Sequence, residues 1–160
     1  MSYIFYKMDE ISARAILGWR YDPPYDIYNL ASDDVESVVQ SMMDPQNAYF
    51  SITDEKGELA AYCCFGREGQ VPGGDYSRDA LDIGMGVRPE LTGRGLGHEF
   101  VDSVLDFAGT TFALCVYRVT VAEFNERALR VWEKAGFQRV DRFQRDRDKR
   151  PFVILVLPQH

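Results

Sequence analysis

The segment from Leu81 to Phe100, LDIGMGVRPELTGRGLGHEF, carries the clearest chemical signal in this sequence. An apolar, strand-like stretch leads into a short loop with three glycines, Gly93, Gly95 and Gly97. Apolar residues then recur at helical spacing. Glycine lets backbone N–H groups converge, and the first turn of a helix adds unpaired donors and a positive dipole. Such a strand–loop–helix unit predicts an anion site, and the anion is most often a phosphate group.

The spacing of these glycines excludes two common nucleotide-binding motifs. A Walker A loop requires Gly-Lys-Ser/Thr, and no such tripeptide follows the glycines. A dinucleotide fingerprint requires GxGxxG spacing and an acidic residue about 20 positions further on. Here the glycines alternate with other residues and His98 follows them. The ligand should therefore be a phosphate-bearing cofactor of another kind, and a simple tight turn is the alternative interpretation.

The elements that must position this loop form an α/β pattern, predicted as a mixed sheet with helices on both faces. Phe152–Leu157 is apolar without alternation and should be covered on both faces. We expect five strands, at 3–7, 47–53, 59–67, beginning at Leu81, and at 117–122, followed by a closing hairpin of 137–143 and 151–157. We expect four helices: one at 9–19, one that begins near Ser32, one from Gly95 to Gly109 or Phe112, and one from the cap Asn125 to Gly136.

A second segment, VAEFNERALRVWEKAGF from Val121 to Phe137, adds a further motif. Together the two segments resemble the GCN5-related N-acetyltransferase (GNAT) superfamily. The family's phosphate loop is Arg/Gln-x-x-Gly-x-Gly/Ala, and its second motif is Asn-x-x-Ala-x-x-x-Tyr-x-Lys-x-Gly-Phe. The residues that match at the same spacing are Asn125, Ala128, Lys134, Gly136 and Phe137, and Val87-Arg88-Pro89-Glu90 matches the usual end of the preceding strand.

The resemblance implies a GNAT-like acyl-CoA N-acyltransferase fold of about seven strands, in which two central parallel strands splay apart and acetyl-CoA lies between them. It implies direct attack of a primary amine on the acetyl group, without a covalent enzyme intermediate. The Val87 N–H would polarise the thioester carbonyl. The implied cofactor-binding residues, which supply backbone partners for pantetheine, the pyrophosphate cradle and contacts from the second motif, are Met85, Gly86, Val87, Thr92, Gly93, Arg94, Gly95, Leu96, Gly97, His98, Asn125, Ala128 and Trp132.

Two positions depart from the family pattern. Thr92 stands where the phosphate loop usually has Arg or Gln, although Arg94 could supply charge. Trp132 stands where many relatives have the tyrosine that protonates the departing thiolate. Indole cannot fill that role, but a CoA thiol is acidic enough to leave with modest help. A non-catalytic acyl-CoA-binding module, or a transferase that uses another acyl-CoA, therefore remains an alternative.

Asp82 and Glu123 are the candidate general bases for the amine. Asp82 lies on the strand that enters the predicted cleft, and Glu123 ends the neighbouring strand. Each could take a proton from an ammonium group through water. The alternative for both is a solvated carboxylate at a strand end. Tyr62 and Tyr117 are possible acids, with an ordinary place in a strand as their alternative.

The loop from Trp19 to Tyr28 is rich in aromatic residues, among them Tyr21, Tyr25 and Tyr28. The resemblance implies that this link between the first two helices walls the acceptor site. Its rings could hold an amine by cation–π contact. The alternative is a loop that simply packs onto the sheet.

Size and composition bound the remaining choices. A chain of 160 residues predicts one domain over residues 1–160. Three cysteines without a CxxC pair and two histidines argue against a metal site or a disulfide framework. The net charge of −7 argues against nucleic acid as a partner. Without an apolar run of membrane-spanning length or a signal-peptide core, we expect a cytoplasmic protein, a monomer or homodimer, that acts on a small-molecule or peptide amine.

Overall fold

The computed structural model describes residues 2–30, 33–113 and 116–158. In these residues the strands form one seven-stranded sheet with the order β1-β2-β3-β4-β5-β7-β6. The mixed α/β architecture predicted from the sequence is confirmed. The elements in chain order are β1 (Ile4–Lys7), α1 (Glu10–Leu17), α2 (Val35–Met43), β2 (Tyr49–Thr53), β3 (Leu59–Phe65), β4 (Leu81–Val87), α3 (Gly97–Thr111), β5 (Tyr117–Ala122), α4 (Glu126–Lys134), β6 (Gln138–Gln144) and β7 (Pro151–Leu157).

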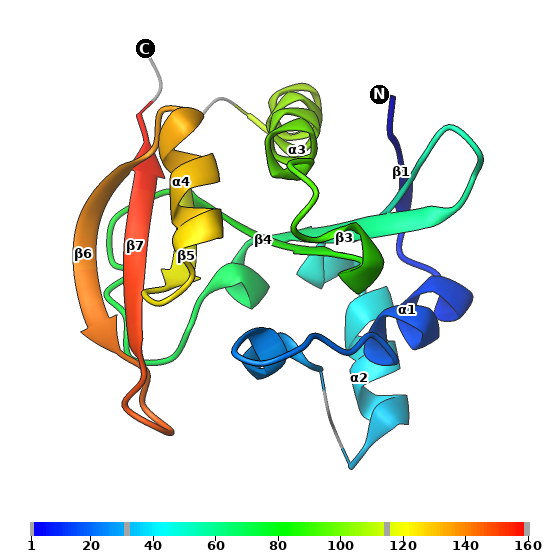
Figure 1. Cartoon of the computed structure of the whole chain (residues 1–160), viewed down its shortest axis with the longest axis horizontal. Helices are drawn as coiled ribbons and strands as arrows, with labels where there is room; N and C mark the ends of the chain where they lie inside the picture. The colour runs from blue at the N-terminus through cyan, green and yellow to red at the C-terminus, as the bar shows by residue number, and fades with distance from the viewer. Residues whose placement is uncertain (1, 31–32, 114–115, 159–160) are drawn as a thin grey trace. The chain divides into compact units, whose positions relative to one another are not determined.

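The chain forms two compact units, and the first comprises residues 1–64 and 85–96. In it β1, β2 and β3 pair antiparallel. The helices α1 and α2 lie side by side, as Figure 1 shows. Their N-caps follow from the sequence: Asp9 accepts a hydrogen bond from the Ser12 N–H at 2.8 Å, and Asp34 accepts one from the Ser37 N–H at 3.0 Å.

The apolar residues of α2 are not all part of the core of this unit. Val39 and Met42 are buried, whereas Val35 and Met43 are 43% and 38% exposed at the two ends of the helix. Val38 packs against the same core, so this face of the helix is buried while its first and last residues are more exposed. The predicted start of this helix near Ser32 falls on a residue outside the described ones. Tyrosines and tryptophan complete the core, whose members are Met8, Ala13, Ile16, Leu17, Val39 and Met42, with Trp19, Val38, Tyr49, Leu59 and Tyr62 packed against them.

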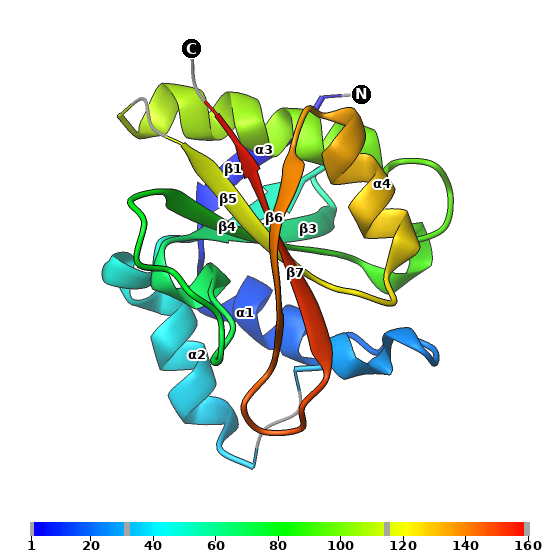
Figure 2. The ribbon, with the colours of Figure 1, turned by 90° about the vertical axis from the view of Figure 1, so that its left-hand side faces the viewer.

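The second unit comprises residues 65–84 and 97–160. The parallel register of β4 with β5 joins Leu81–Ile83 to Tyr117–Val119, the first residues of both strands. β5 pairs antiparallel with β7, and β7 with β6. The helices α3 and α4 lie on one side of β5, β7 and β6 in both views (Figures 1 and 2). Residues 152–155 of β7 are all buried, as the lack of alternation predicted.

Helix boundaries in this unit follow the predicted signals. The Asn125 side chain caps α4 by accepting from the Ala128 N–H at 3.1 Å. Gly136 follows the helix with a φ of 105°, a conformation that favours glycine. In the described part of the chain, none of the helices has both the length and the apolar character needed to cross a membrane.

Candidate functional site

The glycine loop follows β4 and leads directly into α3, so the predicted order of strand, loop and helix is confirmed. Gly93 and Gly95 have φ angles of 72° and 75°, where a residue with a side chain is strained. A Cβ atom built on Gly95 would meet nothing within 4 Å, so the space over this part of the loop is open. The N–H groups that begin α3 follow two residues later. The loop can therefore present backbone donors to an anion without a side chain in the way.

Gly97 is required for helix packing, whereas Gly95 borders open space. A Cβ atom at Gly97 would lie 3.1 Å from Cγ2 of Val131 on α4, so this glycine lets α3 begin close against α4. Within the loop, the Thr92 hydroxyl donates to the Pro89 carbonyl at 2.7 Å. The side chains of Arg94 and His98 are exposed. The roles of these residues towards a cofactor stay predictions.

The residue after β4 is held firmly by β3. The Arg88 N–H donates to the Ala60 carbonyl at 2.9 Å, and Nη1 of the same residue donates to the Leu59 carbonyl at 2.7 Å. Its Nε also lies 3.3 Å from a carboxylate oxygen of Glu90. These contacts fix the direction in which the chain leaves β4 and enters the loop.

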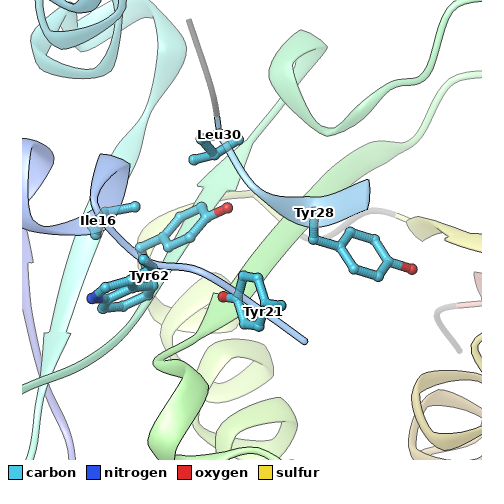
Figure 3. A pocket seen from close by; sticks show the side chains of 6 residues that line it. Ile16, Tyr21, Tyr28, Leu30 and Tyr62 are labelled. Atoms are coloured by element: carbon cyan, nitrogen blue, oxygen red, sulfur yellow. The ribbon is translucent and has the colours of Figure 1, made fainter. Parts of the chain in front are cut away.

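A closed aromatic pocket, with no space for a water molecule, lies in the first unit (Figure 3). Two of the three tyrosines predicted to bind substrate, Tyr21 and Tyr28, line it, while Tyr25 begins the 3-10 turn over 25–28. The Tyr21 hydroxyl donates to the Val87 carbonyl at 2.7 Å. Burial, with a smaller effect of the nearby Glu90 carboxylate, raises the pKa of Tyr21 to about 12. The full lining is Ile16, Trp19, Tyr21, Tyr28, Leu30 and Tyr62.

Asp82 is not a solvated carboxylate but half of a buried ion pair. It is 2% exposed and its partner Arg118 is 4% exposed. Arg118 donates from Nε to Oδ1 of Asp82 at 2.6 Å and from Nη2 to Oδ2 at 2.7 Å. The Gln70 side chain adds a third bond to Oδ2 at 2.9 Å. The carboxylate that the sequence offered as a general base thus accepts three hydrogen bonds, two of them from one guanidinium group.

Sequence reasoning missed Arg118. Its guanidinium also donates to the Arg78 carbonyl at 2.8 Å and lies 4.9 Å from the ring centroid of Tyr76. The bond to Asp82 raises the pKa of Arg118 above its ordinary value. One signal was available: Arg118 is the charged residue in the apolar strand YRVTVA, as Asp82 is in LDIGMGV. Two lone charges of opposite sign in neighbouring parallel strands indicate a pair.

Glu123, the other candidate base, is also ion-paired but open to solvent. Its carboxylate accepts hydrogen bonds from Nε and Nη2 of Arg142, and the side chain is 38% exposed. The hydrogen bonds from Arg142 hold the pKa of Glu123 below its usual range. Glu123 is therefore a solvent-exposed carboxylate, as the alternative interpretation of the sequence stated, but it is paired with an arginine of β6. Glu123 lines a hollow of about 270 Å³ with Phe124, Glu126, Arg150 and Pro151.

Trp132 lies in the core of the second unit. Trp132 is 5% exposed, and its ring contacts the ring of Phe137 edge-on, with the two centroids 5.0 Å apart. Ala128 supplies the N–H that Asn125 caps. Among the described residues, His, Cys, Asp and Glu side chains do not gather in any group of three or more that could hold a metal ion.

The fold is shared with solved structures of other proteins. The structure of a chimera of spermidine N-acetyltransferase SpeG from Vibrio cholerae and hSSAT superposes with a TM-score of 0.77 at 16% identity, over 99% of this chain and 96% of that one. The structure of AAC(6')-Ib in complex with ribostamycin and coenzyme A gives a TM-score of 0.77 at 17% identity, over 99% and 94% of the two chains. The chain therefore shares its fold with these two solved structures.

Sequence comparison identifies the family of the chain. A profile of the acetyltransferase (GNAT) family matches residues 12–137, and the chain belongs to this family. The N-alpha-acetyltransferase RimI of Mycobacterium tuberculosis is 31% identical over 101 residues, which are 63% of this chain and 58% of that protein. The match thus spans a little more than half of that relative's length.

Proposed function

We propose that the protein transfers an acetyl group from acetyl-CoA to a primary amine. The observation that carries the proposal is the glycine loop, where left-handed Gly93 and Gly95 stand between β4 and the first turn of α3 with open space over Gly95. Backbone N–H groups at a helix N-terminus suit a diphosphate. Membership of the acetyltransferase family supports acetyl-CoA as the compound that carries it.

The proposed cofactor contacts are mostly contacts of the backbone. Main-chain groups of Met85 and Val87 would pair with the pantetheine arm in the manner of an added strand, with Gly86 between them. The N–H groups from Gly93 to Gly97 would hold the pyrophosphate. Thr92 and His98 flank that cradle, Leu96 lies within it, and Arg94 can add positive charge. The cap residue Asn125, with Ala128 and Trp132 of α4, would complete the set.

The proposed chemistry asks little of side chains. The Val87 N–H donates to the thioester carbonyl oxygen, which gains negative charge as the amine nitrogen attacks the carbonyl carbon. The new C–N bond forms and the C–S bond breaks. One proton leaves the amine nitrogen for water, and the thiolate of CoA takes one from water. Trp132 supplies no proton, because a buried indole is not an acid at neutral pH.

Glu123 is the better candidate of the two for receiving the amine proton through water. Its side chain is 38% exposed and lines an open hollow, whereas the buried Asp82 carboxylate already accepts three hydrogen bonds from Arg118 and Gln70. Arg142 keeps Glu123 ionised, so it is ready to accept but is a weak base. We assign Asp82 a structural role, in which its ion pair with Arg118 joins β4 to β5.

The acceptor remains open among amines. The names of the relatives mention spermidine, ribostamycin and N-alpha-acetylation, which are chemically diverse. All of them contain or act at an amine, and this supports a small-molecule or peptide amine as the acceptor here.

The test is acetyl-CoA binding by calorimetry, followed by release of free thiol with a panel of amines. The informative variant is Gly95→Val, whose side chain would project into the space proposed for the pyrophosphate. We expect it to weaken acetyl-CoA binding at least about a hundredfold, because it removes space and several charge-assisted hydrogen bonds together.

The matched control is Gly57→Val. Gly57 lies in the turn between β2 and β3 with a φ of 79°, and a Cβ atom there also meets nothing within 4 Å. The backbone strain of the two substitutions is therefore similar, about 1–2 kcal/mol. Equal acetyl-CoA affinity in both variants would refute the site.

A non-catalytic acyl-CoA-binding module is the second candidate. The observation that favours it is Trp132, which packs in the core at the position of the family's acid. Acetyl-CoA binding that depends on Gly95, without thiol release for any amine, would select this candidate.

A further inference from the structure

An open hollow of about 270 Å³ lies in the second unit, where β5 ends and β7 begins. The Glu123 N–H donates to the Pro151 carbonyl at 3.0 Å and so holds the two strand ends together. The volume is slightly below the roughly 300–1,000 Å³ of pockets for drug-sized ligands, so the hollow suits one small molecule. Its lining is Glu123, Phe124, Glu126, Arg150 and Pro151.

Arg150 brings a guanidinium group with spare donors to this hollow. Its Nε is buried and has no hydrogen-bond partner among the residues that the structure describes. Its ion-pair partner is Asp148, whose Oδ2 lies 3.9 Å from Nε. That carboxylate is already bound by Arg145, whose Nε and Nη2 donate to it at 3.1 Å and 2.7 Å. Because a guanidinium group has five N–H donors, Arg150 still has donors to offer to an anion.

The ring of Phe124 bears on how Arg150 presents those donors. Cζ of Arg150 lies over this ring, 5.9 Å from its centroid. An aromatic ring attracts the face of a guanidinium group and leaves its N–H edge to other partners. Nε is buried but the side chain as a whole is 40% exposed, so the donors within reach of a ligand are the terminal Nη groups. The planar fork of such N–H groups matches the two oxygens of a carboxylate.

The hollow also has an acidic side, formed by Glu123 at the end of β5 and Glu126 in the first turn of α4. A ligand with only positive charge would face the Arg150 guanidinium there, and a ligand with only negative charge would face two carboxylates. Like charges brought together at a binding site cost free energy. A small molecule that carries an amine and a carboxylate a few bonds apart gives each side of the hollow an opposite partner.

Resting on the proposed function, we propose that the acceptor is a free α-amino acid whose carboxylate is bound by Arg150. Its nitrogen lies on the side of Glu123, the residue proposed to receive the amine proton through water, and Phe124 and Pro151 offer apolar surface to its side chain. The acetyl group moves from sulfur to this nitrogen while the carboxylate is unchanged, so the products are the N-acetyl amino acid and CoA. A peptide N-terminus lacks this carboxylate, because the group is part of a peptide bond.

The experiment uses the full chain with L-phenylalanine and L-phenylalaninamide, which differ in the carboxylate alone. Arg150→Gln should lower kcat/KM for L-phenylalanine about tenfold and leave that for the amide within about twofold, because a charged hydrogen bond partly open to solvent is lost only with the acid. The two amines need not ionise alike, so each acceptor is compared between variants and not with the other. Arg150→Lys, which keeps the charge without the planar fork, should restore part of the loss.

Arg147→Gln is the matched control, because it removes the same charge from the same β6–β7 turn at an exposed residue that does not line the hollow. It should leave both acceptors unchanged. The thermal midpoint and the dissociation constant of acetyl-CoA should not change in Arg150→Gln, since Nε has no partner to lose in the described part of the chain.

The inference is overturned if Arg150→Gln acts on L-phenylalanine within about twofold of wild type, if it lowers both acceptors equally, if Arg147→Gln loses as much, or if Arg150→Gln loses acetyl-CoA affinity. It is also overturned if neither acceptor is acetylated while another amine is, a result that leaves the proposed function standing. Acetyl-CoA binding without turnover of any amine selects the non-catalytic module and overturns the inference too. Absence of acetyl-CoA binding in wild type refutes the proposed function itself, so the two failures are distinguishable.

Discussion

Asp82→Asn should destabilise the protein by about 3–5 kcal/mol, because it leaves the Arg118 guanidinium buried without a counterion. The carboxylate now accepts from Nε and Nη2 of Arg118 and from the Gln70 amide. Asparagine has one acceptor oxygen, and its NH₂ group must face a donor whichever way it turns. With Asp82 2% and Arg118 4% exposed, water cannot take over the lost role.

The loss should be measured by urea unfolding and by the thermal midpoint. For a domain of this size, 3–5 kcal/mol corresponds to a decrease of roughly 6–20 °C. The double variant Asp82→Asn/Arg118→Gln removes the uncompensated charge and lets two amides bond each other. It should therefore recover part of the stability, which gives a positive coupling energy in a double-mutant cycle.

Glu133→Gln is the comparison from the surface. Glu133 pairs with Arg139, but the two side chains are 40% and 45% exposed, so their loss should scarcely move the midpoint. If Asp82→Asn unfolds at the same urea concentration as wild type, the pair contributes nothing and the anchor role is wrong. If the variant stays stable while kcat/KM collapses and loses its acidic limb, Asp82 is the general base after all, and Glu123→Gln in the same assay should then be silent.

Two further predictions concern the aromatic pocket. A tyrosine in the unfolded chain ionises near pH 10. Burial raises the pKa of Tyr21 to about 12 and also raises the pKa of Tyr62. The contribution of these two neutral phenols to the stability of the folded protein is therefore complete below about pH 10 and is lost as the pH rises through their folded-state pKa values. Absorbance of tyrosinate should show late titrating groups that disappear in Tyr21→Phe and Tyr62→Phe, and an alkaline unfolding slope unchanged by these substitutions would contradict the burial. Gly86→Ala should lower the free energy of unfolding by about 1–3 kcal/mol, because the added methyl group overpacks against Tyr62. Tyr62→Leu in the same chain should restore resistance to urea, and failure to do so would show that the strain arises from another contact.

The parts of the site that could be predicted from sequence are those coded locally. The glycines of the loop, the apolar residues before and after them, and the Asn125 cap each depend on a few neighbouring residues. Backbone preference and helix periodicity act over this range. The left-handed conformations of Gly93 and Gly95 and the start of α3 at Gly97 bear this out.

The parts that sequence could not supply depend on contacts between distant elements. Asp82 and Arg118 are separated by 36 residues, and only the register of β4 with β5 brings them opposite each other. The same is true of Tyr62 and Gly86, where the lack of a side chain on one strand makes room for a ring from another. A glycine in a strand signals a close approach, but it does not say which residue approaches.

The two ion pairs also bear on how an amine would be activated. Both acidic candidates are bound to arginine, Asp82 to Arg118 and Glu123 to Arg142, and the hydrogen bonds from Arg142 hold the pKa of Glu123 below its usual range. A carboxylate held this way can relay a proton from water but cannot pull one from an ammonium ion of high pKa. The protein would then depend on the small neutral fraction of its acceptor and on holding that neutral amine in line with the thioester.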